Sequence, residues 1–224
     1  LCSMVPTLTR FHLTTGIWLF GVCYGLWSVR GFFIRLDPLV SFGIRTLLVA
    51  FGVWAFWTVL GQDFRALARL VRQPRELALI VAAFIGVVVA GDLVLGLLQA
   101  VTGLGGYELR NDEALAQFVD KQPKLVSAIL ICVLGPLGEE LFFRGFLLRF
   151  FGRWWGIVSS IVVSSLIFGA VHMSGLSAAE FIFVIPHICA GIGFAIAAWR
   201  GGIVLSFILH AWVNTMAILP VLLS

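Results

Sequence analysis

The sequence GPLGEELFFRGFLLR, residues 135–149, lies in one of the most apolar parts of the chain, yet it carries the ionisable residues Glu139, Glu140 and Arg144. A charged side chain at the centre of a membrane-spanning helix costs ~2.5–3.5 kcal/mol on insertion scales. Ionisable groups are retained in such helices mainly where they pair with one another or have a function. The stretch therefore indicates a membrane helix that contains a polar site.

The composition is that of a membrane protein. Hydrophobic residues make up 61% of the 224 residues and charged residues 12%, and the mean hydropathy is +1.07. Soluble domains have ~45–50% apolar and ~25% charged residues. No linker, low-complexity segment or repeat divides the sequence, so we expect one integral membrane domain over residues 1–224. The basic residues are scattered singly, which argues against a nucleic-acid partner.

Hydropathy predicts an all-α fold, a polytopic membrane helical bundle with about seven transmembrane helices. Each candidate segment has the ~20 mainly apolar residues that a spanning helix needs. The segments are residues 11–29, 39–60, 77–100, 125–151, 154–173, 180–199 and 202–223. The longer connections are 61–76, which is rich in arginine, and 101–124, which contains several glycines.

The positions of lysine and arginine predict the orientation, because cytoplasmic loops carry an excess of both. One side of the bundle receives eight basic residues, which are Arg10, Arg65, Arg69, Arg72, Arg75, Arg149, Arg153 and Arg200. The other side receives five, which are Arg30, Arg35, Arg110, Lys121 and Lys124. The N-terminus is therefore expected in the cytoplasm.

The two adjacent glutamates have different expected surroundings. Glu140 and Arg144 are spaced i, i+4, which places them on one helical face where they can pair. Glu139 is rotated by ~100° from Glu140 and does not share that face. One carboxylate is therefore expected to be structural and the other available for chemistry. Pro136 cannot donate a backbone hydrogen bond, so the helix should loosen one turn before the glutamates.

Polar residues on two further segments complete a candidate site. His172 lies four residues after Phe168, and His210 and Asn214 are spaced i, i+4, about 6 Å apart along a helix. A single intramembrane His or Asn commonly serves only as a hydrogen-bond partner between helices. Together with Glu139, however, these residues supply a base, two imidazoles and an amide donor, which a hydrolytic site needs.

These residues resemble three motifs of the CAAX prenyl protease type II and bacteriocin-processing family (CPBP, or Abi) of intramembrane endopeptidases. The motifs are E-E-x-x-x-R at Glu139 to Arg144, F-x-x-x-H at Phe168 to His172, and H-x-x-x-N at His210 to Asn214. They occur in order on successive predicted helices, and the resemblance covers about residues 125–216.

The resemblance implies an enzyme that hydrolyses a peptide bond of a peptide or membrane-associated protein without a covalent intermediate or a cofactor. It implies that Glu139 is the general base, assisted by His172, and that His210 and Asn214 stabilise the oxyanion. It also implies that Glu140 belongs to the catalytic residues, that its pairing with Arg144 holds the site, and that Arg144 and Phe168 give structural support. The short chain and loops favour a prokaryotic member in the plasma membrane.

Three alternatives remain at this point. Glu and two His residues form a possible zinc site, although the H-E-x-x-H spacing is absent, and the sequence requires no metal. A catalytically silent member would act as an immunity factor or scaffold, with the same polar residues only ordering the helices. A transporter would use intramembrane acids as a proton relay, but no inverted repeat is visible. The sequence does not indicate an oligomeric state.

Overall fold

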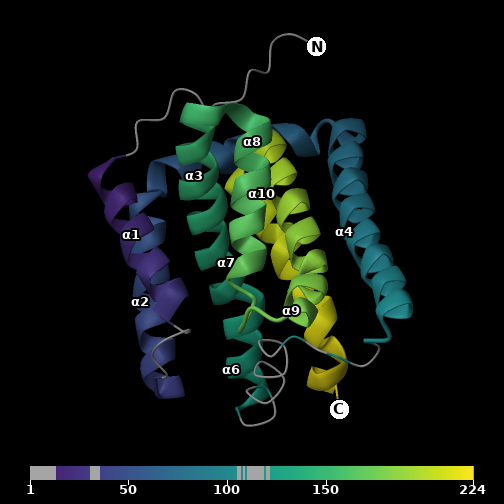
Figure 1. Cartoon of the computed structure of the whole chain (residues 1–224). Helices are drawn as coiled ribbons and strands as arrows, with labels where there is room; N and C mark the ends of the chain where they lie inside the picture. The colour runs from purple at the N-terminus through teal and green to yellow at the C-terminus, as the bar shows by residue number, and fades with distance from the viewer. Residues whose placement is uncertain are drawn as a thin grey trace.

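The computed structural model describes residues 14–30, 36–104, 107, 109, 119 and 122–223. Within these residues the chain is helical and contains no strand. The helices are α1 (Thr15–Arg30), α2 (Pro38–Ala55), α3 (Trp57–Val71), α4 (Pro74–Thr102), α6 (Lys124–Ala128), α7 (Gly135–Glu140), α8 (Leu148–Ala170), α9 (Ala178–Phe183) and α10 (Ile185–Leu223). Two π-helical segments, η2 (Ile129–Leu134) and η3 (Leu141–Leu147), flank α7 (Figure 1). The expected all-α class is confirmed.

Some predicted features lie outside the described residues. They are the start of the first predicted span, most of the predicted connection 101–124, and the basic residues Arg10, Arg35, Arg110 and Lys121.

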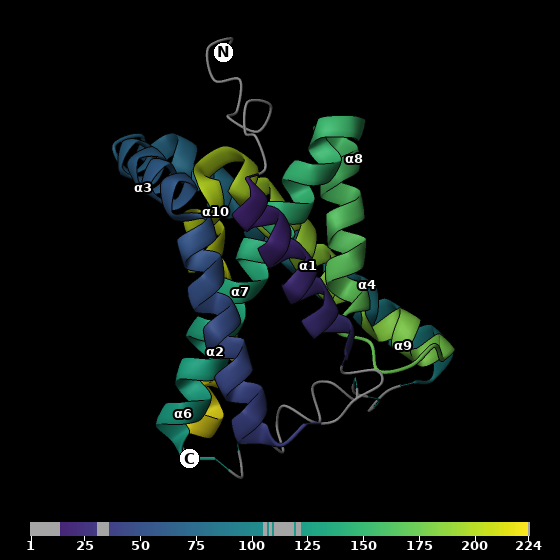
Figure 2. The same cartoon turned by 90° about the vertical axis from the view of Figure 1, so that its left-hand side faces the viewer.

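The predicted span over residues 39–60 is wrong at its C-terminal end. α2 ends at Ala55, and α3 starts at Trp57 after a bend of 73°. Apolar residues continue through this bend to Leu60, so hydropathy alone does not reveal it. The predicted arginine-rich connection is largely helical, because α3 extends to Val71. α3 therefore crosses one end of the bundle instead of continuing along α2 (Figures 1 and 2).

Two glycines with positive φ interrupt the long C-terminal helices. Gly156 has φ 76° within α8, and Gly202 has φ 87° within α10. A left-handed backbone is unfavourable for residues with a Cβ atom, and glycine adopts it readily. The chain turns back on itself at these breaks, which lie at the same end of the molecule as α3 (Figures 1 and 2). The breaks lie near the predicted boundaries between residues 151 and 154 and between residues 199 and 202.

The number of spans differs from the prediction. By length and composition, three described helices can cross a membrane: Pro74–Thr102, Lys124–Ala170 and Ala178–Pro220. If the bent pair Val40–Ala55 and Trp57–Val71 is counted as one span, the number of candidate spans rises to four. Thr15–Val29 is a shorter apolar helix. The predicted count of seven is therefore not confirmed.

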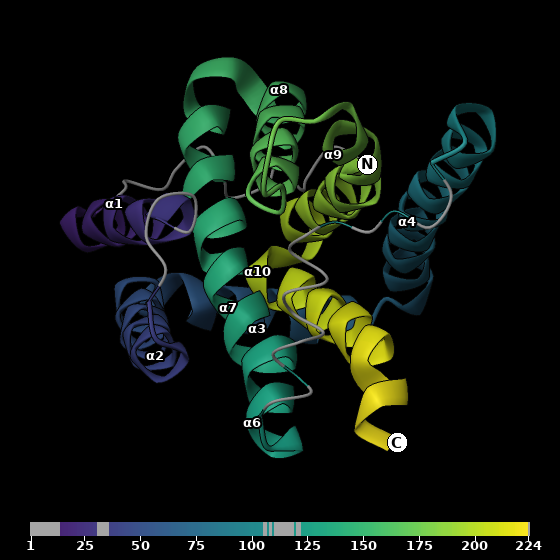
Figure 3. The ribbon, with the colours of Figure 1, turned by 60° about the horizontal axis from the view of Figure 1, so that its bottom comes forward.

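The outer surface of the bundle is apolar and its interior is rich in aromatic rings. Large apolar side chains such as Leu47, Leu79 and Leu93 are about 70% exposed, and so large an exposed apolar surface indicates contact with lipid. The interior instead buries a cluster of rings, which includes Phe20, Tyr24, Phe56, Phe142, Phe143, Phe168 and Phe194. Apolar helices and an apolar exterior fit an integral membrane protein. With the bottom of the molecule in Figure 1 turned toward the viewer, α7 and α10 run side by side at the centre (Figure 3).

Candidate active site

The helix that carries the two glutamates is wound more widely on both sides of them. The segment η2 ends at Leu134, directly before Gly135 and Pro136, and η3 begins at Leu141. Proline removes a backbone donor, and π-helical turns are frequent at functional sites. The predicted loosening of the helix before the glutamates is therefore confirmed.

Glu140 is completely buried and satisfied by three neighbours. Its Oε1 accepts hydrogen bonds from Arg144 Nη1 at 3.1 Å and from His210 Nδ1 at 2.9 Å. Its Oε2 lies 2.5 Å from the Ser206 hydroxyl. A carboxylate without exposure to water needs such compensation. The predicted pairing of Glu140 with Arg144 is confirmed, and Glu140 also links α7 to α10.

Arg144 is held by a carbonyl and by aromatic faces as well as by Glu140. Its Nη2 donates to the Gly191 carbonyl at 3.0 Å. The guanidinium carbon lies 4.5 Å from the centre of the Phe168 ring and 5.3 Å from that of Phe194. Because cation–π contacts are strongest where water is excluded, Arg144 fastens η3 to α8 and α10. Phe168, predicted as support of the site, lies beneath this cation.

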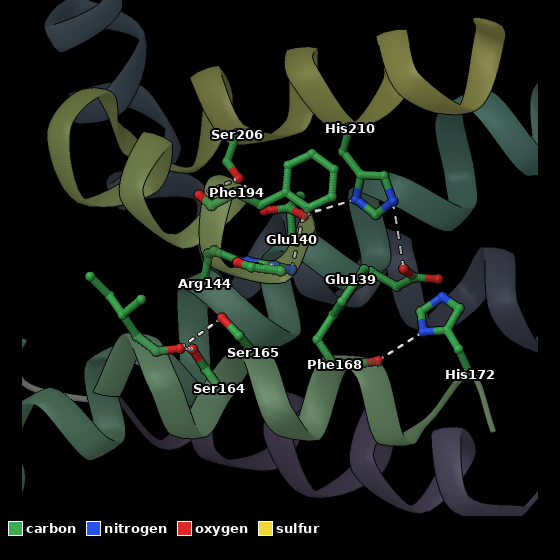
Figure 4. Close-up of polar contacts among 12 residues, drawn as sticks. Glu139, Glu140, Arg144, Ser164, Ser165, Phe168, His172, Phe194, Ser206 and His210 are labelled. Carbon is green, nitrogen blue, oxygen red and sulfur yellow. Dashed lines mark hydrogen bonds and ion pairs between the residues drawn. The ribbon is translucent and has the colours of Figure 1, made fainter. Parts of the chain in front are cut away.

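Glu139 faces a different environment from its neighbour. Its side chain is 20% exposed, compared with 0% for Glu140, and its Oε2 lies 3.8 Å from His210 Nε2. The carboxylate points toward the imidazole rings of His172 and His210 (Figure 4). Glu139 is therefore the carboxylate of the pair that stays partly accessible.

The ring of His172 is oriented by its own helix. His172 follows the last turn of α8, and its Nδ1 lies 2.8 Å from the Phe168 carbonyl oxygen. A carbonyl oxygen only accepts, so Nδ1 carries the proton and donates it. In the neutral ring Nε2 then has a free lone pair. The Phe168 ring lies 4.8 Å from that of His172 and 5.8 Å from that of His210.

His210 and Asn214 are both anchored to the helix that carries the glutamates. His210 Nδ1 donates to Glu140, which leaves Nε2 facing Glu139. Asn214 Nδ2 donates to the Ile131 carbonyl of η2 at 2.9 Å. An asparagine amide has two N–H bonds, so the second donor of Asn214 is not used by that contact.

The structure also identifies site residues that the sequence interpretation missed. Ser206 donates within the Glu140 network, and Phe194 stacks on His210 with ring centres 4.4 Å apart. Ser206 precedes His210 by four residues and therefore shares the face of His210 and Asn214, which was a usable signal. His187 lies 4.4 Å from His172, ring centre to ring centre. The sequence could not reveal this contact, because it depends on the packing of α10 against α8.

Neither Ser164 nor Ser165 has the environment of a nucleophile. The hydroxyls of both donate to the Ile161 carbonyl of their own helix, at 3.2 and 2.7 Å. Figure 4 shows them on the far side of Arg144 from Glu139. In the described part of the chain, no three or more His, Cys, Asp and Glu side chains are arranged so that they could hold a metal ion.

One comparison with known proteins gives a match. A family model described as Rce1-like, type II CAAX prenyl endopeptidase, matches residues 121–216. No curated protein and no solved structure matches the chain. The matched segment contains all three sequence motifs and runs from three residues before α6 into the C-terminal half of α10. The match supports the CAAX protease, or CPBP, family for the segment of residues 121–216.

Proposed function

We propose that the protein is an intramembrane endopeptidase that hydrolyses a peptide bond with water activated by Glu139. The observation that supports this most strongly is the unequal environment of the two glutamates. Glu140 is fully buried and bound by Arg144, Ser206 and His210, whereas Glu139 is partly exposed beside two imidazoles. A general base needs access to water and to a nearby proton carrier.

The proposed reaction begins with a water molecule between Glu139 and His172. Glu139 takes one proton from the water, and the lone pair on His172 Nε2 accepts a hydrogen bond from the O–H that remains and so orients the oxygen. The water oxygen then bonds to the carbonyl carbon of the substrate. The proton held by Glu139 passes to the leaving amine nitrogen as the C–N bond breaks.

His210 and Asn214 would stabilise the oxyanion that forms on the carbonyl oxygen. Asn214 offers its second amide N–H, and His210 offers Nε2 when the ring is protonated. Because Nδ1 donates to Glu140 at 2.9 Å, the buried carboxylate compensates the charge of the imidazolium. Prepositioned donors of this kind are a major source of catalysis in acyl transfer. Glu140 and Arg144 then act by holding His210 in place.

The substrate class that we propose is a peptide or the tail of a membrane-associated protein. The matched family is named for CAAX prenyl endopeptidases, so a prenylated C-terminal tail is the first candidate. The protein would act as one integral domain in the plasma membrane of a prokaryotic cell, with its N-terminus in the cytoplasm. No metal or other cofactor enters this mechanism.

Comparison of membranes that contain wild-type protein with membranes that contain Glu139→Gln tests this proposal. The new polypeptide termini in each sample are identified by mass spectrometry. We expect at least one membrane-associated protein to be cut only in the wild-type sample. Identical termini in both samples, with both proteins present and folded, would instead favour a catalytically silent immunity factor or scaffold.

A further inference from the structure

A buried carboxylate from outside the family-matched segment contacts the start of the helix that carries the proposed oxyanion donors. Asp63 of α3 is only 6% exposed, and its Oδ2 accepts the backbone N–H of Ile203 at 2.7 Å. Ile203 directly follows the break at Gly202. It is therefore the first residue of the helical portion that contains Ser206, His210 and Asn214.

The contact satisfies a donor that the local sequence cannot satisfy. The first backbone N–H groups of a helix have no partner within that helix, and a nearby Ser, Thr, Asp or Asn usually caps them. Here Gly201 and Gly202 precede Ile203 and have no side-chain acceptor. Asp63, which is 140 residues away in the sequence, provides the carboxylate instead.

The surroundings of Asp63 leave space for its carboxylate and place a buried cation near it. Gly202 adopts φ 87°, and a Cβ atom at this position would lie 2.5 Å from Asp63 Cγ. Arg149, only 7% exposed, interacts electrostatically with Asp63 from the start of α8. The absent side chain at position 202 therefore leaves the space that the carboxylate occupies, and the buried cation offsets part of the cost of burying it.

The capped end and the site residues share one helical face. Residues 206, 210 and 214 are spaced by four and follow Ile203 by three, seven and eleven residues, which is close to whole helical turns. His210 lies about 10 Å along the axis from Ile203 at 1.5 Å per residue. A rotation of about 6° around the capped end would thus move His210 by about 1 Å, a displacement that can reduce catalysis by about a hundredfold.

We propose that Asp63 is a positioning residue of the active site. Its carboxylate caps the second half of α10 and thereby fixes His210 and Asn214 relative to Glu139 and Glu140. This inference depends on the proposed function for its catalytic consequence but not for the cap itself. The two parts are therefore tested separately.

Hydrogen exchange at the Ile203 amide tests the cap in the full-length protein. We compare wild-type protein with Asp63→Ala, which removes the acceptor, and Asp63→Asn, which keeps an acceptor oxygen. Arg65→Ala, an exposed change on the same helix, is the control. We expect exchange to become about tenfold faster in Asp63→Ala only, because the amide then lacks its partner. Unchanged exchange in Asp63→Ala would overturn the proposal.

Cleavage of a quenched farnesylated C-a-a-X peptide tests the catalytic consequence, at a temperature at which every variant is folded. We expect Asp63→Ala to lower kcat by about tenfold to a hundredfold with KM within about twofold. Asp63→Asn and Arg65→Ala should stay near wild type. A kcat near wild type in Asp63→Ala, or equal losses in the folded Asn and Ala variants, would contradict positioning by the cap.

Cleavage by Glu139→Gln at the wild-type rate would instead refute the proposed function, while the exchange result would still decide the cap.

Discussion

Glu139 and Glu140 are neighbours in sequence, but the helix gives them separate surroundings. A rotation of ~100° per residue turns Glu140 toward Arg144, Ser206 and His210 and turns Glu139 toward partly exposed space. The i, i+4 pairing was predictable from helical periodicity alone. The spacing of Ser206 to His210 indicated only that Ser206 shares its face; the bond from Ser206 to Glu140 was not predictable, because it depends on how α10 packs against α7.

Replacement of Glu140 by Gln should destabilise the protein much more than the same change at Glu139. Glu140→Gln leaves the Arg144 guanidinium buried without its counter-ion, which costs about 3–5 kcal/mol. Glu139→Gln removes no such compensation. Thermal unfolding of both variants in detergent measures the difference. Equal shifts in unfolding temperature would show that the two carboxylates do not divide the roles as we describe.

Loss of the Asn214 amide should reduce turnover and not binding. Removal of one oxyanion donor typically lowers kcat by about 10²–10³-fold, so Asn214→Ala should show this loss with little change in KM. Thr215→Val is the matched control, because the Thr215 hydroxyl only donates to the Ala211 carbonyl of its own helix. If steady-state kinetics give similar kcat values for the two variants, Asn214 is not an oxyanion donor.

At the scale of the elements, the glycine breaks decide how the motifs meet. Gly156 and Gly202 reverse the chain at the same end of the bundle (Figure 2), so that residues of α7, α8 and α10 reach the same site. Hydropathy placed boundaries near both breaks, because glycine and charged residues interrupt the apolar runs there. The bend between α2 and α3 has no comparable interruption of the apolar run, so hydropathy could not predict it. The wider winding before the glutamates was predicted from Pro136 and not from hydropathy.

Replacement of Gly156 and of Gly202 by alanine should lower the unfolding temperature by different amounts. Both positions have positive φ, for which a Cβ atom costs about 1–2 kcal/mol. The space around Gly156 is open, whereas a Cβ at Gly202 would meet Asp63. We therefore expect a modest decrease in unfolding temperature for Gly156→Ala and a larger one for Gly202→Ala, with loss of cleavage. Equal effects in thermal unfolding would exclude the close contact with Asp63.

α3 has three different faces. Val59, Asp63 and Leu70 are buried in the protein, whereas Trp57, Phe64 and Val71 form an exposed apolar stripe. Arg65, Arg69 and Arg72 are exposed on a further side. An amphipathic helix of this kind is suited to the membrane interface, with its apolar stripe in lipid and its basic side in water.

At the scale of the whole molecule, the described basic residues support the predicted grouping. α3, the start of α1 and both glycine breaks lie at one end, and Lys124 begins α6 at the other (Figure 1). The motifs could be read from the sequence because they follow helical spacing. The contact of Asp63 with Ile203 could not, because it joins residues 140 positions apart.

Labelling of single cysteines from each side of the membrane should reveal this arrangement. With a membrane-impermeant maleimide, Arg65→Cys should react only from the cytoplasmic side and Lys124→Cys only from the outside. Phe64→Cys should react from neither side, because its stripe faces lipid. Reaction of Arg65→Cys and Lys124→Cys from the same side would exclude the proposed topology.

The most direct test of the central claim is the turnover of purified Glu139→Gln protein beside wild type. Both are assayed on the quenched farnesylated C-a-a-X peptide, at a temperature at which both are folded. We expect wild-type protein to cleave the peptide, with or without a chelator, and Glu139→Gln to bind it without cutting it. Cleavage by Glu139→Gln at the wild-type rate would contradict the account.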